Sequence, residues 1–140
     1  MKDFRSLEAA YRAARYRVQT DPPIDLSIGS NSAALAALLR WAGVTQAAIV
    51  TAYTPGSARQ SADANAAADR TLRAGLEERG FDLRDTIAID PSGEWPDEPG
   101  VLVLGIDVED ARVLGRAFGQ NAIVTIDDAG AVSLAWCRSA

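Results

Sequence analysis

Polar residues gather directly after the apolar run Ala47–Val50, and they form the first candidate for a ligand site. Hydroxyl side chains and the free backbone N–H groups of a helix start can hold an anion or a phosphate. The same residues can instead cap a strand-to-helix turn, and the sequence leaves both readings open. The pattern lacks the glycines and the lysine of a P-loop, which disfavours a nucleoside triphosphate. The candidate residues are Thr51, Tyr53, Ser57 and Asn65.

Two further candidates lie later in the chain. Gln120 and Asn121 follow Gly119, where their amides could read a ligand through paired donors and acceptors or could satisfy the end of a helix. Trp95 lies in the long polar stretch 90–100. Its ring could form a lid over a site, anchor a protein partner or tuck over the edge of the core.

The composition removes several kinds of catalysis. The chain has no histidine and one cysteine, which excludes Ser-His-Asp and Cys-His catalysis and metal sites built from histidine or several thiolates. An enzyme would need a carboxylate or Tyr53 as its acid or base, and no spacing assigns one. We therefore rank an enzyme below a binding domain or an interaction module, and we expect no cofactor.

Four carboxylates near the ends of two predicted strands are the candidates for a magnesium site. In a chain of net charge −5 such residues are usually solvated surface, so we expect no metal. These residues are Asp90, Glu94, Asp107 and Asp110.

The bulk properties are those of an ordinary globular chain. Its 140 residues, 48 % of them hydrophobic and 24 % charged, predict one α/β domain over 1–140. The acidic balance disfavours a nucleic-acid partner, since nucleic acids select basic surfaces. No apolar run is long enough to span a bilayer. The charged N-terminus and the lone Cys137 predict a cytoplasmic protein without a membrane partner.

The elements that must position these residues follow from periodicity. Apolar spacings of three and four predict a helix over 3–14, and alternation on both sides of a proline turn predicts an antiparallel hairpin over 16–28. A helix over 32–42 then leads to a strand over 47–52. We expect this unit to be a right-handed crossover, which makes strands 24–28 and 47–52 parallel.

The second half of the chain predicts a helix over 61–79 with Asn65 turned toward the sheet, strands over 86–89 and 101–106, and a helix over 109–118. A hairpin over 122–136 ends the chain. The expected fold is α/β, a mixed sheet with parallel central strands, antiparallel hairpins at the ends and flanking helices.

Three stretches together resemble a known family. They are Ile24-Asp25-Leu26-x-Ile28-Gly29; Ile49-Val50-Thr51-Ala52-Tyr53-x-Pro55-x-Ser57 with Asn65; and Leu104-Gly105-Ile106 with Phe118-Gly119-Gln120-Asn121-Ala122. The chain resembles the small bacterial proteins called domain of unknown function 3293, from about Tyr16 to Trp136. Family members usually carry Asn where this chain has Thr54. The resemblance implies a bacterial α/β domain and no particular activity.

Our leading hypothesis is a domain that binds an anionic or nucleotide-like small molecule at the end of strand 47–52. Thr51, Tyr53, Ser57 and Asn65 would contact the ligand, and Trp95 would close over it. The alternative is a protein-interaction or regulatory module without catalytic activity. Its basis is the acidic charge and two candidate exposed tryptophans, Trp41 and Trp95.

Overall fold

The computed structural model describes residues 4–53 and 60–137. These residues form four helices and a seven-stranded sheet. The helices are α1 (Phe4–Ala13), α2 (Ala33–Ala42), α3 (Ala62–Glu78) and α4 (Val108–Ala117). The strands are β1 (Arg15–Val18), β2 (Ile24–Leu26), β3 (Ala47–Val50), β4 (Asp82–Ile89), β5 (Glu98–Leu104), β6 (Ala122–Ile126) and β7 (Val132–Trp136).

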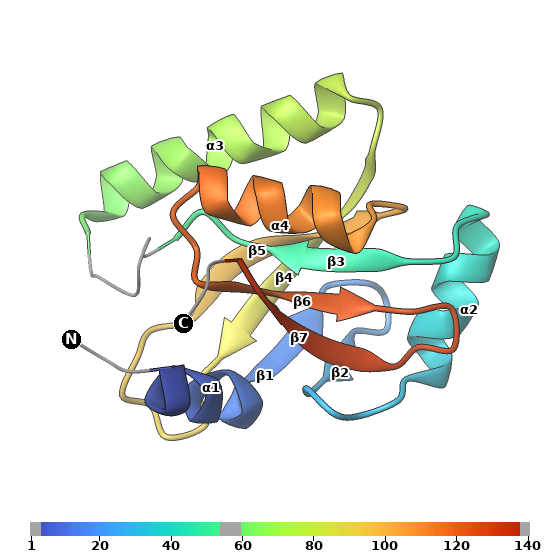
Figure 1. Cartoon of the computed structure of the whole chain (residues 1–140), viewed down its shortest axis with the longest axis horizontal. Coiled ribbons are helices and arrows are strands. Elements are labelled where there is room, and N and C mark those ends of the chain that lie inside the picture. The colour runs from blue at the N-terminus through green and yellow to red at the C-terminus, as the bar shows by residue number, and fades with distance from the viewer. Residues whose placement is uncertain (1–3, 54–59, 138–140) are drawn as a thin grey trace.

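Every pairing among the described strands is antiparallel, in the order β2-β1-β4-β5-β3-β6-β7. The expected parallel centre is therefore wrong. Strand β2 lies at one edge beside β1, whereas β3 lies between β5 and β6, so α2 does not connect neighbouring strands. Figure 1 shows the strongly twisted sheet with α3 and α4 on one side and with α1 and α2 against its other side.

The apolar run of β3 explains the error. All four of its residues are buried, a pattern typical of parallel strands because helices usually cover both faces of a parallel sheet. Here an antiparallel sheet is covered on both faces. Ala47 and Ile49 face a core shared with α2, while Ala48 and Val50 face a second core shared with α3 and α4. The apolar run of β3 therefore indicates that both faces of the strand are buried, but it does not indicate whether the strand is parallel or antiparallel to its neighbours.

The two terminal hairpins are confirmed. Strands β1 and β2 pair through Tyr16 and Leu26 at one edge, and β6 and β7 pair through Val124 and Leu134 at the other. The first hairpin turns at the cis peptide bond Asp21–Pro22. Its position beside β4 brings β1, and α1 before it, to the side of the sheet where the pocket described below lies.

Side-chain caps and a left-handed glycine define the helix ends. Ser32 caps α2 by accepting a hydrogen bond from Leu35 N, and Ser61 caps α3 in the same way from Ala64 N. Gly43 ends α2 in the left-handed conformation with φ 74°. Asp107 caps α4 through Asp110 N.

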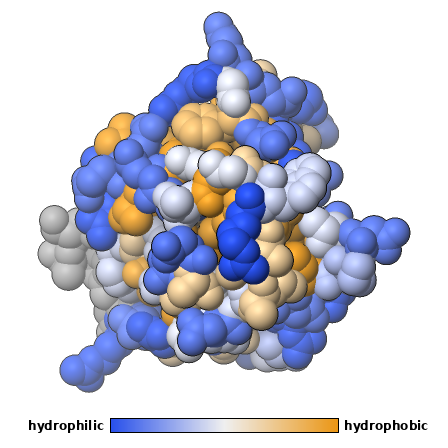
Figure 2. Space-filling model, turned by 90° about the vertical axis from the view of Figure 1, so that its right-hand side faces the viewer, coloured by the Kyte–Doolittle hydropathy of each residue, from blue (hydrophilic) through white to orange (hydrophobic). Residues whose placement is uncertain are grey.

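The surface over α2 carries an exposed tryptophan. Trp41 is 76 % exposed. Figure 2 views the molecule from this side and shows hydrophilic residues interrupting the apolar ones. Among the described residues, no helix is long and apolar enough to cross a membrane.

Candidate functional site

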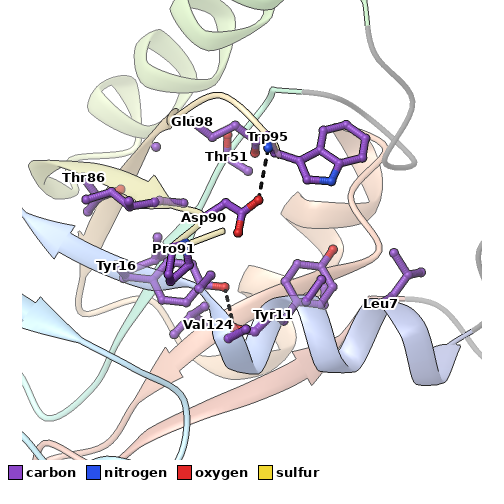
Figure 3. A pocket seen from close by; sticks show the side chains of 18 of the residues that line it. Leu7, Tyr11, Tyr16, Thr51, Thr86, Asp90, Pro91, Trp95, Glu98 and Val124 are labelled. Carbon is purple, nitrogen blue, oxygen red and sulfur yellow. Dashed lines mark hydrogen bonds between the residues drawn. The ribbon is translucent and has the colours of Figure 1, made fainter. Parts of the chain in front are cut away.

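A pocket of about 620 Å³ lies between α1, the loop 90–97 and one face of the sheet. Strands β1, β3, β4, β5 and β6 all contribute to it. Figure 3 shows the β4–β5 loop with Trp95 on one side of the pocket and Tyr11 and Leu7 of α1 on the other. This volume lies within the range of sites that hold a small molecule.

Gly100 lies in the floor of the pocket, where it pairs with Thr86 across the β4–β5 ladder. A Cβ atom at Gly100 would lie 3.0 Å from Thr86 Oγ1, 3.0 Å from Val50 O and 3.5 Å from Thr51 Cβ. The two threonines therefore lean together over a position that accepts no side chain. Glycine is required here by close approach, not by its backbone conformation.

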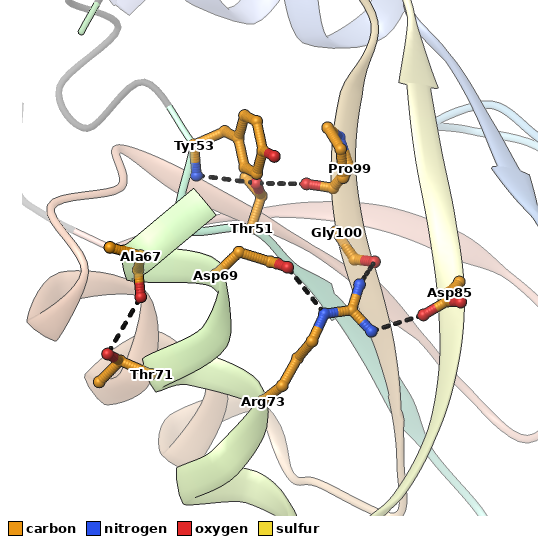
Figure 4. A network of polar contacts seen from close by, with 9 residues as sticks. All are labelled: Thr51, Tyr53, Ala67, Asp69, Thr71, Arg73, Asp85, Pro99 and Gly100. Carbon is orange, nitrogen blue, oxygen red and sulfur yellow. Dashed lines mark hydrogen bonds and ion pairs between the residues drawn. The ribbon is translucent and has the colours of Figure 1, made fainter. Parts of the chain in front are cut away.

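The hydroxyl of Thr51 is occupied by the protein. It donates to Pro99 O at 2.8 Å and accepts from Tyr53 N at 3.0 Å, as Figure 4 shows. These bonds join the end of β3 to β5 and fix the direction in which the chain leaves the sheet. Thr51 lines the pocket, but its hydroxyl already donates one hydrogen bond and accepts another within the protein.

Two other polar side chains at the pocket keep unused hydrogen-bonding capacity. Thr86 is 2 % exposed, and its hydroxyl makes no hydrogen bond with another described residue. Gln120 is 6 % exposed. Its amide nitrogen donates to Tyr53 O at 3.0 Å and Phe118 O at 3.4 Å, while its amide oxygen accepts nothing from the described part of the chain. Buried polar groups usually have a partner, so water or a ligand is expected at both.

Aromatic side chains form much of the wall. Tyr16 is buried, and its hydroxyl donates to Tyr11 O at 3.4 Å (Figure 3). Burial, with smaller contributions from Tyr11 and Glu98, raises the pKa of Tyr16 well above its usual value, so the phenol stays neutral. The ring of Tyr11 packs edge-on against Trp136 with the ring centres 5.9 Å apart. Together with Trp95 these rings provide flat apolar surfaces.

The loop 90–97 is folded around one carboxylate. Asp90 accepts hydrogen bonds from Ser92 N at 2.9 Å, Ser92 Oγ at 2.8 Å and Trp95 N at 3.1 Å. The hydrogen bond from the Ser92 hydroxyl is the largest cause that lowers the pKa of Asp90 below its usual value. The ionised carboxylate thus holds Trp95 in its place beside the pocket (Figure 3).

The charged side chains in the described lining of the pocket are all acidic. Among the described residues that line it, three carry a carboxylate and none is a lysine or an arginine. The carboxylates are Asp90, Glu94 and Glu98. An anionic ligand would therefore be repelled by the described lining, whereas an uncharged ligand would not.

The structure brings only some of the sequence candidates together. Thr51, Trp95 and Gln120 line the pocket, and Tyr53 contributes a carbonyl that holds Gln120. Asn65 is 9 % exposed as expected, but it lies on α3 and accepts a hydrogen bond from Gln60 Nε2 at 2.6 Å away from this pocket.

Two more candidates do not contribute a described side chain to the pocket. Asn121 is buried but is absent from the pocket lining, and its carbonyl accepts from Cys137 N. Ser57 lies outside the described residues.

Sequence reasoning missed Thr86, Tyr16 and the wall supplied by α1. A signal for Thr86 did exist, because it is a polar residue within the apolar strand segment 86–89. Tyr16 and α1 gave no such signal. Their place beside the pocket depends on the pairing of β1 with β4. These strands are about 70 residues apart in the sequence, as the pair Tyr16 and Ala88 shows.

The four candidate magnesium ligands do not converge. Asp90 and Glu94 both lie in the loop 90–97, whereas Asp107 caps α4 and Asp110 forms an ion pair with Arg79. No group of three metal-binding side chains was found in the described parts of the chain.

One known protein family matches this chain. A family model described as a protein of unknown function, DUF3293, matches residues 50–123, which is more than half of the 140 residues. The chain belongs to this family. The resemblance seen in the sequence is thereby confirmed. Searches of curated proteins and of solved structures found no match.

The DUF3293 match covers most of the pocket floor. It includes Thr51, Thr86, the loop 90–97 and Gln120, whereas the wall formed by α1 and Tyr16 lies before it. The residues with unused hydrogen-bonding capacity are therefore within the matched region, which is where a property shared by the family would have to reside.

Proposed function

We propose that this DUF3293 protein binds an uncharged small molecule with a largely apolar body in the pocket beneath Trp95. The observation that carries this proposal is the combination of a cavity of about 620 Å³ with two buried polar side chains, Thr86 and Gln120, that have hydrogen bonds left to make. Pockets that are mainly apolar and contain a few fixed polar groups are typical of ligand sites.

The charge of the ligand differs from our expectation from sequence. An anion or a nucleotide would need cationic side chains or free N–H groups, and the described lining offers three carboxylates instead. Thr51, which led to the expectation of an anion, uses its hydroxyl on Pro99 O and Tyr53 N. An uncharged ligand fits these observations better than an anionic one.

A thermal-shift screen tests this proposal. The compounds should include nucleosides, nucleotides, phosphorylated metabolites and uncharged aromatic metabolites. A ligand present at a hundredfold its Kd stabilises the folded state by about 2.7 kcal/mol, which raises the melting temperature of a domain of this size by several degrees. We expect the stabilising compounds to be uncharged.

A pocket-filling variant supplies the specificity control. Ala88 lies on β4 opposite Tyr16 and lines the pocket, so Ala88→Phe places a ring in the cavity. The matched control is Ala129→Phe, in the exposed turn before β7. Stabilisation lost in Ala88→Phe and kept in Ala129→Phe supports the proposal. An empty screen, or stabilisation only by anions, would remove it.

A protein-interaction role is the second candidate, and the exposure of Trp41 favours it. Large exposed aromatic residues are frequent anchors of interfaces. A partner that binds the wild-type chain and Ala88→Phe alike, but not Trp41→Ser, would support this role. Loss of partner binding in Ala88→Phe would instead assign the interaction to the pocket.

A further inference from the structure

We infer that Thr86 and Gln120 recognise the two polar ends of one elongated, flat, uncharged ligand of the nucleoside type. This inference rests on the proposed function and adds the chemical class of the ligand. Both side chains are uncharged, so each selects for a hydrogen-bonding group at a defined position on the ligand.

Gln120 fixes what one end of the ligand must offer. Its amide nitrogen faces two carbonyl oxygens, Tyr53 O and Phe118 O, so the amide cannot turn over without placing its oxygen against them. The amide oxygen is consequently held away from both carbonyls as an acceptor that takes nothing from the described chain. The ligand end that meets it must carry an N–H or O–H donor.

Thr86 fixes a second polar position, at the other side of the floor. Its hydroxyl lies 3.0 Å from where a Cβ of Gly100 would be, so the glycine leaves that side of the hydroxyl uncovered by a side chain. A hydroxyl can donate and accept, so Thr86 tolerates either kind of group.

The distance between these positions sets the length of the ligand. Thr86 lies on β4 and Gln120 directly precedes β6, with β5 and β3 between them in the sheet. With neighbouring strands about 4.8 Å apart, the backbone positions of the two residues lie roughly 14 Å apart across the sheet. A ligand that reaches both side chains must therefore extend across the two strands between them. A single ring is too short for this span.

The aromatic walls of the pocket and its acidic side chains restrict the chemical class of the ligand further. Tyr11, Tyr16 and Trp95 offer surfaces on which a flat ring can stack. Asp90 and Glu98 disfavour a phosphate group. A heteroaromatic base with donors on its edge, joined to an uncharged sugar whose hydroxyl lies at the far end, meets every one of these requirements.

Calorimetric titration with adenosine, uridine and their 5′-monophosphates tests the inference. We expect at least one nucleoside to bind and its monophosphate to bind at least tenfold more weakly. Thr86→Val removes one neutral hydrogen bond while keeping the shape of the side chain, so it should weaken nucleoside binding by about threefold to tenfold. Thr86→Ser should restore binding, since it restores the hydroxyl.

Gln120→Met tests the other end and should weaken nucleoside binding by a similar factor, provided its melting temperature shows that it is folded. Thr125→Val is the matched control, because this threonine lies on β6 outside the lining of the pocket and its hydroxyl donates to Ser133 O. It should bind like the wild type.

The outcomes separate the inference from the proposed function. Suppose that neither nucleoside binds but another uncharged compound does. If Ala88→Phe abolishes the binding of that compound and Thr86→Val leaves its affinity unchanged, the inference fails and the proposed function remains. Equal binding of nucleoside and monophosphate also overturns the inference. If no uncharged compound binds at all, both fail.

Discussion

At the scale of single residues, Asp90 shows how one carboxylate can determine the shape of a loop. It accepts hydrogen bonds from Ser92 and from the backbone of Trp95, and it does so while lying in contact with solvent. Because the bonds favour the ionised form, protonation of Asp90 must weaken them. The position of Trp95 beside the pocket is therefore linked to pH.

The first prediction concerns this linkage. The pKa of Asp90 is lowered from its ordinary value of 3.8, chiefly by the hydrogen bond from Ser92. A lowered folded-state pKa means that its stabilising effect is fully present above 3.8 and is lost as the pH falls through the lower value. The backbone amide resonances of Ser92 and Trp95 should report this transition between pH 6 and about pH 2.5, and Asp90→Ala should abolish it.

Asp97→Ala supplies the control, because Asp97 is an exposed carboxylate of the same loop. It should leave the transition in place. A midpoint at or above 3.8 for the Trp95 amide would contradict the role given to Asp90.

The two pocket threonines give the second prediction, since they differ in what their hydroxyls do. Thr51 donates to Pro99 O and accepts from Tyr53 N, so Thr51→Val should lower the free energy of unfolding by about 1–2 kcal/mol. The hydroxyl of Thr86 has no partner among the described residues. Without ligand, Thr86→Val should therefore be neutral or stabilise by up to about 1 kcal/mol.

Urea unfolding of both variants, in the same buffer and without added ligand, measures this difference. If Thr86→Val is destabilised as much as Thr51→Val, the hydroxyl of Thr86 is already satisfied within the protein. It would then not be available to a ligand.

At the scale of elements, α4 packs closely against β6 and against Cys137, the residue that follows β7, through a glycine. A Cβ at Gly115 would lie 2.5 Å from Cys137 Sγ and 3.0 Å from Ile123 Cγ2. Gly75 of α3 differs, because a Cβ there would meet nothing within 4 Å. The same substitution at the two glycines should consequently have opposite effects.

This contrast is the third prediction. Gly75→Ala should stabilise the protein by up to about 1 kcal/mol, since alanine is the better helix former. Gly115→Ala should destabilise it by about 1–3 kcal/mol, because the added methyl forces apart a helix and a strand that are in contact. Urea midpoints measure both changes. A stabilised Gly115→Ala would show that α4 does not approach Ile123 and Cys137 as closely as described.

The observed helices and strands also show what the periodicity of apolar residues can and cannot predict. Apolar spacing predicts most of the helices and strands, and the helix over 61–79 begins at its N-cap Ser61 because capping is local chemistry. Strand direction was predicted wrongly, because the apolar run of β3 depends on burial of both faces. The partners of β3 lie about 50 residues or more later in the chain, beyond the reach of local patterns.

The candidate site was predicted in part for the same reason. Thr51, Trp95 and Gln120 follow strands or lie in a loop, where polar side chains are conspicuous in the sequence. Asn65 was correctly predicted to be buried, but helical phase does not say which cavity a buried face adjoins. Tyr16 and α1 enter the pocket only through the pairing of β1 with β4.

At the scale of the whole molecule, one arginine connects the helical layer to the strands behind the pocket floor. Arg73 of α3 binds Asp69 on its own helix, Asp85 on β4 and the carbonyl of Gly100 on β5, as Figure 4 shows. Gly100 is also the residue over which Thr86 leans on the pocket side. The layer of α3 and the floor of the pocket are therefore joined at this residue.

The fourth prediction follows from that connection. Arg73→Met should lower the free energy of unfolding by about 1–2 kcal/mol, because it leaves Asp69 partly buried without its cation. Arg73→Lys should recover little, since an ammonium group cannot form the three bonds of a planar guanidinium. Arg12→Met, at the exposed pair with Glu8, is the control and should change stability by less than about 0.5 kcal/mol. Equal effects at both arginines would refute the structural role of Arg73.

Resonance mapping by NMR tests the central claim most directly. A ¹⁵N-labelled chain is titrated with adenosine, or with the strongest uncharged compound from the screen, and the shifted resonances are placed on the structure. We predict the largest shifts at Thr86, at the indole of Trp95 and at the side-chain amide of Gln120, and none at Trp41. Shifts confined to Trp41 or to α3, or no shifts with any uncharged compound, would contradict the account.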